Sequence, residues 1–218
     1  MRVTHLGHAC LLVEMADRRI LVDPGNFSSG FENLTDLDAI LVTHNHPDHF
    51  DPEPAARLIR VNPRATVHAD PLTAEKLGAE GLQAVPTRQD EQFAIGDITV
   101  TPVGELHAFN NDQVPQIPNV GLVLRADGEP TLFHPGDAYD AEPGEVDVLA
   151  HPLNAPWCAS RDSIAFVARV APKAFVPIHD ALLSERGKRM YCTHIESFSG
   201  VDGLTLRYLA DGESGEFQ

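Results

Sequence analysis

Cysteine is scarce in this chain of 218 residues, which contains only Cys10, Cys158 and Cys192. Their number is odd, they lie far apart and no C-x-x-C pair is present, so the sequence does not carry a disulfide framework. Cys192 lies two residues before His194, which leaves a metal site there conceivable. Buried free thiols are the simpler interpretation, because isolated cysteines usually pack as small apolar side chains.

Positive charge is also in short supply, with 16 Lys and Arg against 32 Asp and Glu and a formal net charge of −16. An acidic surface repels nucleic acid and anionic membranes unless it carries a local basic patch. Arg186, Lys188 and Arg189 could bind a phosphate or carboxylate, although a solvated run of charges is the simpler interpretation. We therefore expect a small-molecule substrate and neither nucleic acid nor membrane as a partner.

Long hydrophobic runs are absent, and no stretch reaches the length of a membrane span. The first residues lack the charged-then-apolar layout of a signal peptide, which predicts a cytoplasmic location. Hydrophobic residues make up 43% and charged residues 22% of the chain, as in ordinary globular proteins. The length predicts one domain over residues 1–218. No pattern indicates the oligomeric state.

Histidine, in contrast, is concentrated in the segment Thr43-His44-Asn45-His46-Pro47-Asp48-His49. The apolar residues 37–42 before it predict a buried strand, so the segment forms the loop at the strand's C-terminal end. Imidazole and carboxylate are ligands that suit zinc and related divalent ions. His44 and His46 can bind one ion while Asp48 and His49 turn toward a second. Solvated loop histidines are the alternative.

Three further candidate ligands follow predicted strands. His107 comes after the strand at 98–103, Asp137 after the strand at 131–134 and a glycine, and His179 directly after the strand at 174–178. Each alone is more typical of a turn, but together they supply a ligand at three strand ends. The pattern predicts two metal sites, with His44, His46 and His107 on one ion, Asp48, His49 and His179 on the other, and Asp137 bridging.

The remaining pattern predicts an α/β fold with two sheets flanked by helices. Strands are expected at 2–6, 10–15, 19–23, 65–69, 82–85, 92–95, 121–125 and 146–150, and helices at 51–62, 72–77 and 162–170. Asp51 is the predicted N-cap of the first helix. Residues 181–194 fit no pattern. Asp23 ends the third strand, either as a turn residue or as the partner of a metal-bound histidine.

The sequence pattern resembles that of the metallo-β-lactamase superfamily. The resemblance rests on Gly7-His8-Ala9-Cys10-Leu11-Leu12-Val13-Glu14, Asp23, the histidine segment, His107, Gly136-Asp137 and His179, in that order. The chain looks most similar to the small single-domain branch related to ascorbate-6-phosphate lactonase. The resemblance implies an αββα sandwich and two divalent metal ions, usually zinc and sometimes manganese or iron. It also implies that Asp23 holds a metal-bound histidine in place.

The function expected from this resemblance is metal-dependent hydrolysis. A hydroxide that bridges two ions would attack an ester, lactone or phosphoester of a small metabolite, and Asp48 would orient the nucleophile or move its proton. A histidine at position 46, where diiron oxygen reductases of the superfamily have glutamate, favours hydrolysis. A phosphodiesterase or nuclease, and a metal-bound protein without turnover, are the alternatives.

The other histidines divide into two groups. His8 and His151 are predicted to line the substrate pocket, because each lies in a loop near the predicted metal ligands. Asn154 and Trp157 follow His151 and could line the same pocket, although loop residues satisfied by backbone groups are the simpler interpretation for these two and the alternative for His8 and His151. His134 has no assigned role, and His5, His68 and His194 are interpreted as incidental.

Overall fold

The computed structural model describes all 218 residues, and the N-terminal half supplies most of the first sheet. Its strands lie in the order β14-β1-β2-β3-β4-β5-β6. They are β1 (Arg2–His5), β2 (Leu11–Met15), β3 (Arg18–Val22), β4 (Ala39–Val42), β5 (Thr66–Ala69), β6 (Val85–Pro86) and β14 (Ser214–Glu216). Helices α1 (Pro52–Val61) and α2 (Pro71–Ala79) connect β4 to β5 and β5 to β6.

The second sheet has the order β13-β12-β11-β10-β9-β8-β7. Its strands are β7 (Phe93–Ile95), β8 (Ile98–Val103), β9 (Gly121–Arg125), β10 (Leu132–His134), β11 (Val148–Pro152), β12 (Ala174–Ile178) and β13 (Thr205–Leu206). Helix α3 (Ser160–Val170) precedes β12, and α4 (Glu185–Phe198) follows it.

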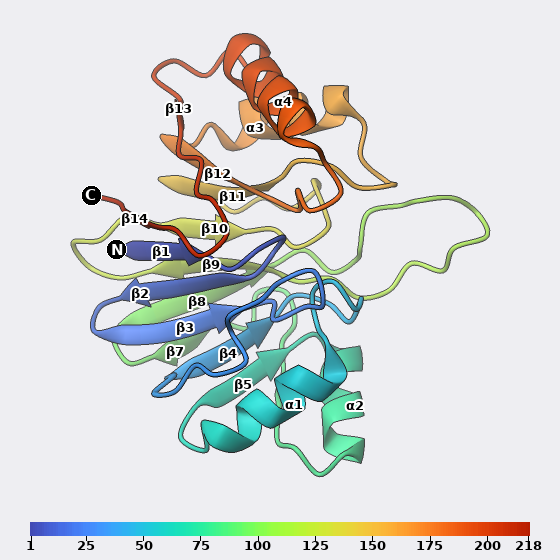
Figure 1. Ribbon diagram of the computed structural model, residues 1–218, viewed down its shortest axis with the longest axis vertical. Helices are drawn as coiled ribbons and strands as arrows, with labels where there is room; N and C mark the ends of the chain where they lie inside the picture. Colours follow the sequence, from blue (N-terminus) through green and yellow to red (C-terminus); the bar gives the residue numbers. More distant parts are fainter.

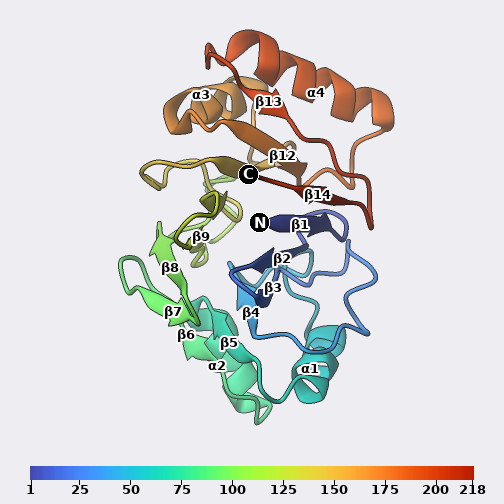
Figure 2. The same ribbon diagram turned by 90° about the vertical axis from the view of Figure 1, so that its left-hand side faces the viewer.

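Three hydrophobic clusters hold four layers together. The largest lies between the sheets and joins Leu41 and its neighbours on β1–β4 to Leu124, Val176 and others on β8–β12. A second packs the outer face of the first sheet against α1 and α2, and a third packs the second sheet against α3 and α4. Figures 1 and 2 show the two helix pairs at opposite ends of the molecule, with the sheets between them. This is the predicted αββα sandwich.

Parallel strands bring the candidate ligands to one edge. β3, β4 and β5 are parallel neighbours in one sheet, and β10, β11 and β12 in the other. Asp23 follows β3, the histidine segment follows β4, and Asp137 and His179 follow β10 and β12. Because the ends of parallel strands lie along the same edge of a sheet, segments far apart in sequence meet there.

The helices and strands predicted from periodicity are present, with boundaries that differ by a few residues. The sequence did not reveal α4, β13 or β14. The predicted strand end at Ala150 was wrong, because β11 continues through His151 to Pro152. Asp51 precedes α1 as predicted, but its side chain makes no capping hydrogen bond. None of the helices is both long enough and apolar enough to span a bilayer.

Candidate metal centre

The histidine segment is anchored by Asp23, which is fully buried at the end of β3. Its Oδ1 accepts from the Thr43 backbone N–H (2.8 Å), and its Oδ2 accepts from the Thr43 hydroxyl (2.7 Å). His49 Nδ1 lies 2.7 Å from the same Oδ2. Since a carboxylate can only accept, Nδ1 carries the proton and Nε2 presents its lone pair. The geometry therefore favours the orienting role for Asp23 over that of a mere turn residue.

His107 and His179 are oriented by backbone carbonyls. His107 Nδ1 donates to the Ala108 carbonyl (2.8 Å), and His179 Nδ1 donates to the Asn154 carbonyl (2.7 Å). In both rings the proton is thereby assigned to Nδ1, and Nε2 is the free acceptor. Metal-binding histidines are usually held in this way, with one ring nitrogen on an oxygen acceptor and the other on the ion.

His44 is also held through its Nδ1, in this case by the Thr43 hydroxyl. The Thr43 hydroxyl donates to Asp23, so it accepts from His44 Nδ1, which lies 3.1 Å away. His44 Nε2 then points away from Thr43 and lies 3.1 Å from His46 Nδ1. His44 is fully buried, whereas His46 is half-buried and forms the outer side of this group.

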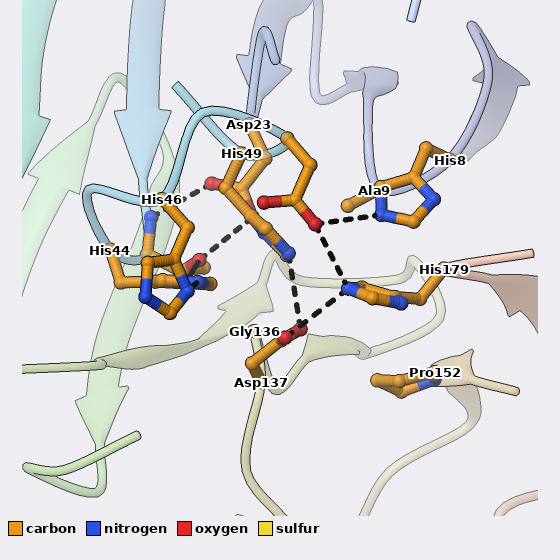
Figure 3. Close-up of polar contacts among 12 residues, drawn as sticks. His8, Ala9, Asp23, His44, His46, His49, Gly136, Asp137, Pro152 and His179 are labelled. Carbon is orange, nitrogen blue, oxygen red and sulfur yellow. Dashed lines mark hydrogen bonds and ion pairs between the residues drawn. The ribbon is translucent and has the colours of Figure 1, made fainter. Parts of the chain in front are cut away.

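Asp137 lies between the two groups of histidines. Its Oδ1 is 3.1 Å from His49 Nε2, and its Oδ2 is 3.2 Å from His179 Nε2 and 3.4 Å from His107 Nε2. Figure 3 shows His44 and His46 on one side of the centre, His8 and His179 on the other, and Asp137 facing both. This is the position that a bridging carboxylate requires.

The turn before Asp137 admits only glycine. Gly136 has φ +62°, and a Cβ there would lie 2.2 Å from Asn119 Oδ1 and 2.8 Å from the Thr43 Cβ. Asn119 also accepts the Asp137 backbone N–H at 2.9 Å. The close approach of these segments fixes Asp137 against the histidine loop. The roles of Thr43 and Asn119 were missed from the sequence, since single Thr and Asn residues carry no pattern.

All seven predicted ligands come together, and His8 joins them. Candidate ligand atoms within 4.8 Å of one another form three groups: His44, His46 and His107; His8, Asp48, His49 and His179; and His44, His49 and Asp137. The first two groups match the predicted division between two ions, apart from His8. The third group links them through Asp137.

The donor set fits a cation. Nε2 of His49, His107 and His179 and Oδ1 of Asp137 are all buried without a hydrogen-bond partner. An unpaired buried polar atom is costly, and lone pairs that converge without a donor between them are satisfied by a metal ion. The Nδ1–H groups of the same rings are paired, so only the lone pairs facing the centre are left. Imidazole and carboxylate suit zinc, manganese or iron.

Protonation without a cation follows from the same contacts. Burial alone lowers the pKa of His179, but the nearby carboxylates of Asp137 and Asp48 favour the charged ring and raise the pKa to about 9. Burial likewise lowers the pKa of His49, yet the Asp137 and Asp23 charges raise it well above its usual value. Burial would raise the pKa of Asp137, but charged His49 and His179 hold it well below its usual range. Without a metal ion, the protons on His49 and His179 therefore supply the positive charge that balances the carboxylates.

His8 contacts Asp48 rather than open solvent. Its Nε2 lies 3.1 Å from Asp48 Oδ2, its ring lies 3.9 Å from the His179 ring, and it is only 1% exposed. The Ala181 backbone N–H donates to its Nδ1 at 3.4 Å, which places the ring proton on Nε2, facing the carboxylate. A substrate contact for His8 stays a prediction. The observed contact is with a candidate ligand.

His151 lies in β11 and not in the predicted loop. Its ring is fully buried, its Nε2 is 2.7 Å from the Ser163 hydroxyl, and it stacks on Tyr139. It belongs to none of the candidate ligand groups. The strand pairing with β12 explains the difference, because it extends β11 two residues past Ala150. A fully enclosed ring has no open side for a substrate.

His134, which had no predicted role, is also fully buried, and its Nε2 lies 2.9 Å from the Ala9 carbonyl.

Comparison with known proteins places this geometry in a family. A sequence profile described as the beta-lactamase superfamily domain matches residues 2–179. The chain belongs to the metallo-β-lactamase superfamily. Protein Rv0786c of Mycobacterium tuberculosis is 40% identical over 207 residues, covering 94% of this chain and 96% of that protein. A UPF0173 metal-dependent hydrolase of Carboxydothermus hydrogenoformans is 30% identical over 194 residues, covering 82% and 84%.

Two solved structures share the fold. The metallo hydrolase Igni18 from Ignicoccus hospitalis superposes with a TM-score of 0.78 at 18% identity, covering 100% of this chain and 99% of that one. An isothiocyanate hydrolase from Delia radicum gut bacteria gives a TM-score of 0.74 at 19% identity, with the same coverage. Family membership and the His and Asp cluster identify the chain as a metal-dependent hydrolase of the metallo-β-lactamase superfamily.

Proposed function

We propose that the centre holds two divalent ions, most simply Zn²⁺, and that the protein hydrolyses an ester or lactone bond in a small, uncharged metabolite. One observation carries the proposal: Nε2 atoms of three histidines and one oxygen of Asp137 face a common buried space without hydrogen-bond partners. Two groups of ligand-type atoms flank Asp137, which supports two ions rather than one. A cytoplasmic location stays a prediction from the sequence.

Such ions, when bound, lower the pKa of water and polarise a carbonyl oxygen. The chain's own residues fix where this happens. Asp23, the Ala108 carbonyl and the Asn154 carbonyl hold three imidazoles with Nε2 toward the centre. These three rings need not reorient during a turnover, because each is held on its far side.

Asp48 is proposed to orient the attacking water or to move its proton. Its side chain is 23% exposed, while those of His49, Asp137 and His179 are at most 4% exposed, so Asp48 can reach both the centre and solvent. Burial would raise its pKa, but the nearby His179 ring and the hydrogen bond from His8 lower it well below the usual value, so it stays ionised. An ionised carboxylate at this position can orient the attacking water, and because its low pKa makes it a weak base, it would pass that water's proton on to solvent rather than keep it.

The surroundings favour an uncharged substrate. None of the ligand side chains pairs with Lys or Arg, and Lys188, close in sequence to His179, is already held by Asp180 at 2.8 Å and Glu185 at 3.6 Å. Phe27, 45% exposed, packs edge-on against His8 with ring centroids 5.1 Å apart. The two proposed ions could bind one phosphate, but a nucleic acid or a polyanionic phosphodiester carries further negative charges that Lys or Arg usually bind. The lack of such side chains weighs against the nuclease alternative and against highly charged phosphodiesters.

The test combines metal analysis with a panel of chromogenic lactones, carboxyl esters and phosphodiesters. We expect two ions per chain and turnover of lactone or ester well above that of phosphodiester. Faster phosphodiester cleavage would favour the alternative enzyme, and two bound ions with no turnover on any substrate would favour a binding role. His44→Ala and His49→Ala should lose metal and activity together. Full activity in either purified, metal-quantified variant would contradict the ligand assignment.

A further inference from the structure

The loop after β11, residues 153–159, contacts the metal centre at two points. The Asn154 carbonyl accepts from His179 Nδ1 at 2.7 Å. Three residues later, the Trp157 indole Nε1–H donates to Asp137 Oδ2 at 2.9 Å. One loop thus holds a terminal candidate ligand and the carboxylate shared by both groups. Its own start is fixed by the hydrogen bond from the Leu153 N–H to the Ile178 carbonyl (2.9 Å).

We propose that Trp157 is a positioning residue for the metal centre, acting through its hydrogen bond to Asp137. The inference rests on the proposed metal site but not on the identity of the substrate. It assigns Trp157 a role different from both the pocket-lining and the loop role considered from the sequence.

The two carboxylate oxygens of Asp137 make different contacts. Oδ2 accepts the indole N–H and also faces His107 and His179, whereas Oδ1 faces His49 and has no hydrogen-bond partner. A carboxylate oxygen has two lone pairs, so the indole leaves one on Oδ2 and both on Oδ1 for cations. Without this donor the carboxylate could rotate about its Cβ–Cγ bond, since that torsion is soft.

Packing holds the indole itself in place. The Trp157 ring lies edge-on to Tyr139, with centroids 4.9 Å apart, and 6.0 Å from the His107 ring. The Tyr139 hydroxyl in turn donates a hydrogen bond to the Pro152 carbonyl and lies 3.2 Å from Cys158 Sγ. The donor is therefore presented at a fixed angle, as a positioning group requires.

Trp157 is the only tryptophan in the chain, so its emission reports on this site alone. Zn²⁺ added to metal-free protein should change the emission with the same midpoint as binding measured by chelator competition. Emission that stays constant while two ions bind would contradict direct contact between Trp157 and the centre.

The variant test compares Trp157→Phe with Tyr139→Phe. The first keeps an aromatic ring but removes the N–H donor, and the second disturbs the same aromatic cluster without touching Asp137. We expect Zn²⁺ affinity to fall roughly 10-fold or more in Trp157→Phe, as for other groups that orient ligands, and by a clearly smaller factor in Tyr139→Phe, which keeps the ring packed on the indole. Equal affinities in the wild type and Trp157→Phe would overturn the proposal.

A replacement by 3-benzothienylalanine, in which sulfur takes the place of the indole N–H, covers the case in which the Phe variant fails to fold. Its metal affinity should fall like that of Trp157→Phe. Wild-type protein that binds no metal would overturn the proposal together with the metal site. Wild-type protein that binds two ions but hydrolyses neither ester nor lactone would contradict the proposed function alone, while the affinity comparison still decides the role of Trp157.

Discussion

At the scale of single residues, Asp23 is the side chain on which the histidine loop depends. It is fully buried and accepts from the Thr43 N–H, the Thr43 hydroxyl and His49 Nδ1. Asp23→Asn would place an amide N–H₂ against these donors. Zn²⁺ affinity should therefore fall roughly 10- to 100-fold, which chelator competition would measure. Asp38→Asn is the matched control, because Asp38 accepts the Arg19 N–H (2.9 Å) outside the metal centre.

His151 gives a prediction about pH. Burial lowers its pKa to about 3, so the folded protein keeps the ring neutral while the unfolded chain binds a proton below the ordinary value of 6.5. Its contribution to stability is present above pH 6.5 and is lost as the pH falls toward 3. Between pH 6.5 and 4 the loss is about 3 kcal/mol.

Metal-free wild type and His151→Gln, which can still bond Ser163, should therefore differ in their pH dependence. Urea denaturation at several pH values would show a steeper loss of stability in the wild type on acidification. Parallel curves for the two proteins would contradict the burial of a neutral imidazole.

At the scale of elements, the turn after β3 and the histidine loop are packed backbone against backbone. A Cβ on Gly25 would lie 1.9 Å from the Asp48 carbonyl oxygen, which cannot move without shifting the loop. Gly25→Ala should lower the melting temperature, by the equivalent of roughly 1–3 kcal/mol, and weaken metal binding.

Gly78→Ala is the matched control in helix α2. A Cβ there has no atom within 4 Å, so the change should be neutral or stabilising by up to about 1 kcal/mol. Thermal denaturation of both variants would compare them. If Gly25→Ala were as stable as wild type and bound metal normally, the close approach of the two loops would be refuted.

Helix α4 is joined to the ligand loop by one ion pair. Lys188 Nζ lies 2.8 Å from Asp180 Oδ2, and the side chains are 14% and 3% exposed. Lys188→Met would leave the Asp180 charge buried and unpaired, next to His179. We expect a loss of roughly 3 kcal/mol in unfolding free energy, against little change for the exposed Arg189→Met. Equal stability of the two variants would show that the pair does not hold the helix.

The elements also show why the sequence predicted some features and not others. β4 is a continuous apolar run, and α1 has an acid in its first turn with proline, so both carry local signals. Helix α4 is rich in charged and polar residues and buries only Cys192 and Ile195, so few apolar residues marked it as a helix that packs on the sheet. β13 is two residues long and β14 three, and their pairing is set by distant strands.

At the scale of the whole molecule, the strands at the two ends of the chain pair with each other at one edge of the first sheet. β1 pairs with β14 across almost the full length of the chain, and Figure 1 shows the N- and C-termini next to each other. No local pattern predicts such a contact. The clustering of the candidate ligands was predictable, because each follows a strand, in the order seen in the superfamily. The proposed role of Trp157 and the contacts of Asn119 and Thr43 were not, since they arise only where distant loops meet.

The central claim is that two cations share Asp137 at the edge where the sheets meet. Anomalous diffraction at the zinc edge from metal-loaded crystals tests it most directly. The account predicts two peaks about 3.5–4 Å apart. One should lie beside His44, His46 and His107, the other beside Asp48, His49 and His179, with Asp137 touching both. A single peak, or peaks away from these side chains, would contradict it.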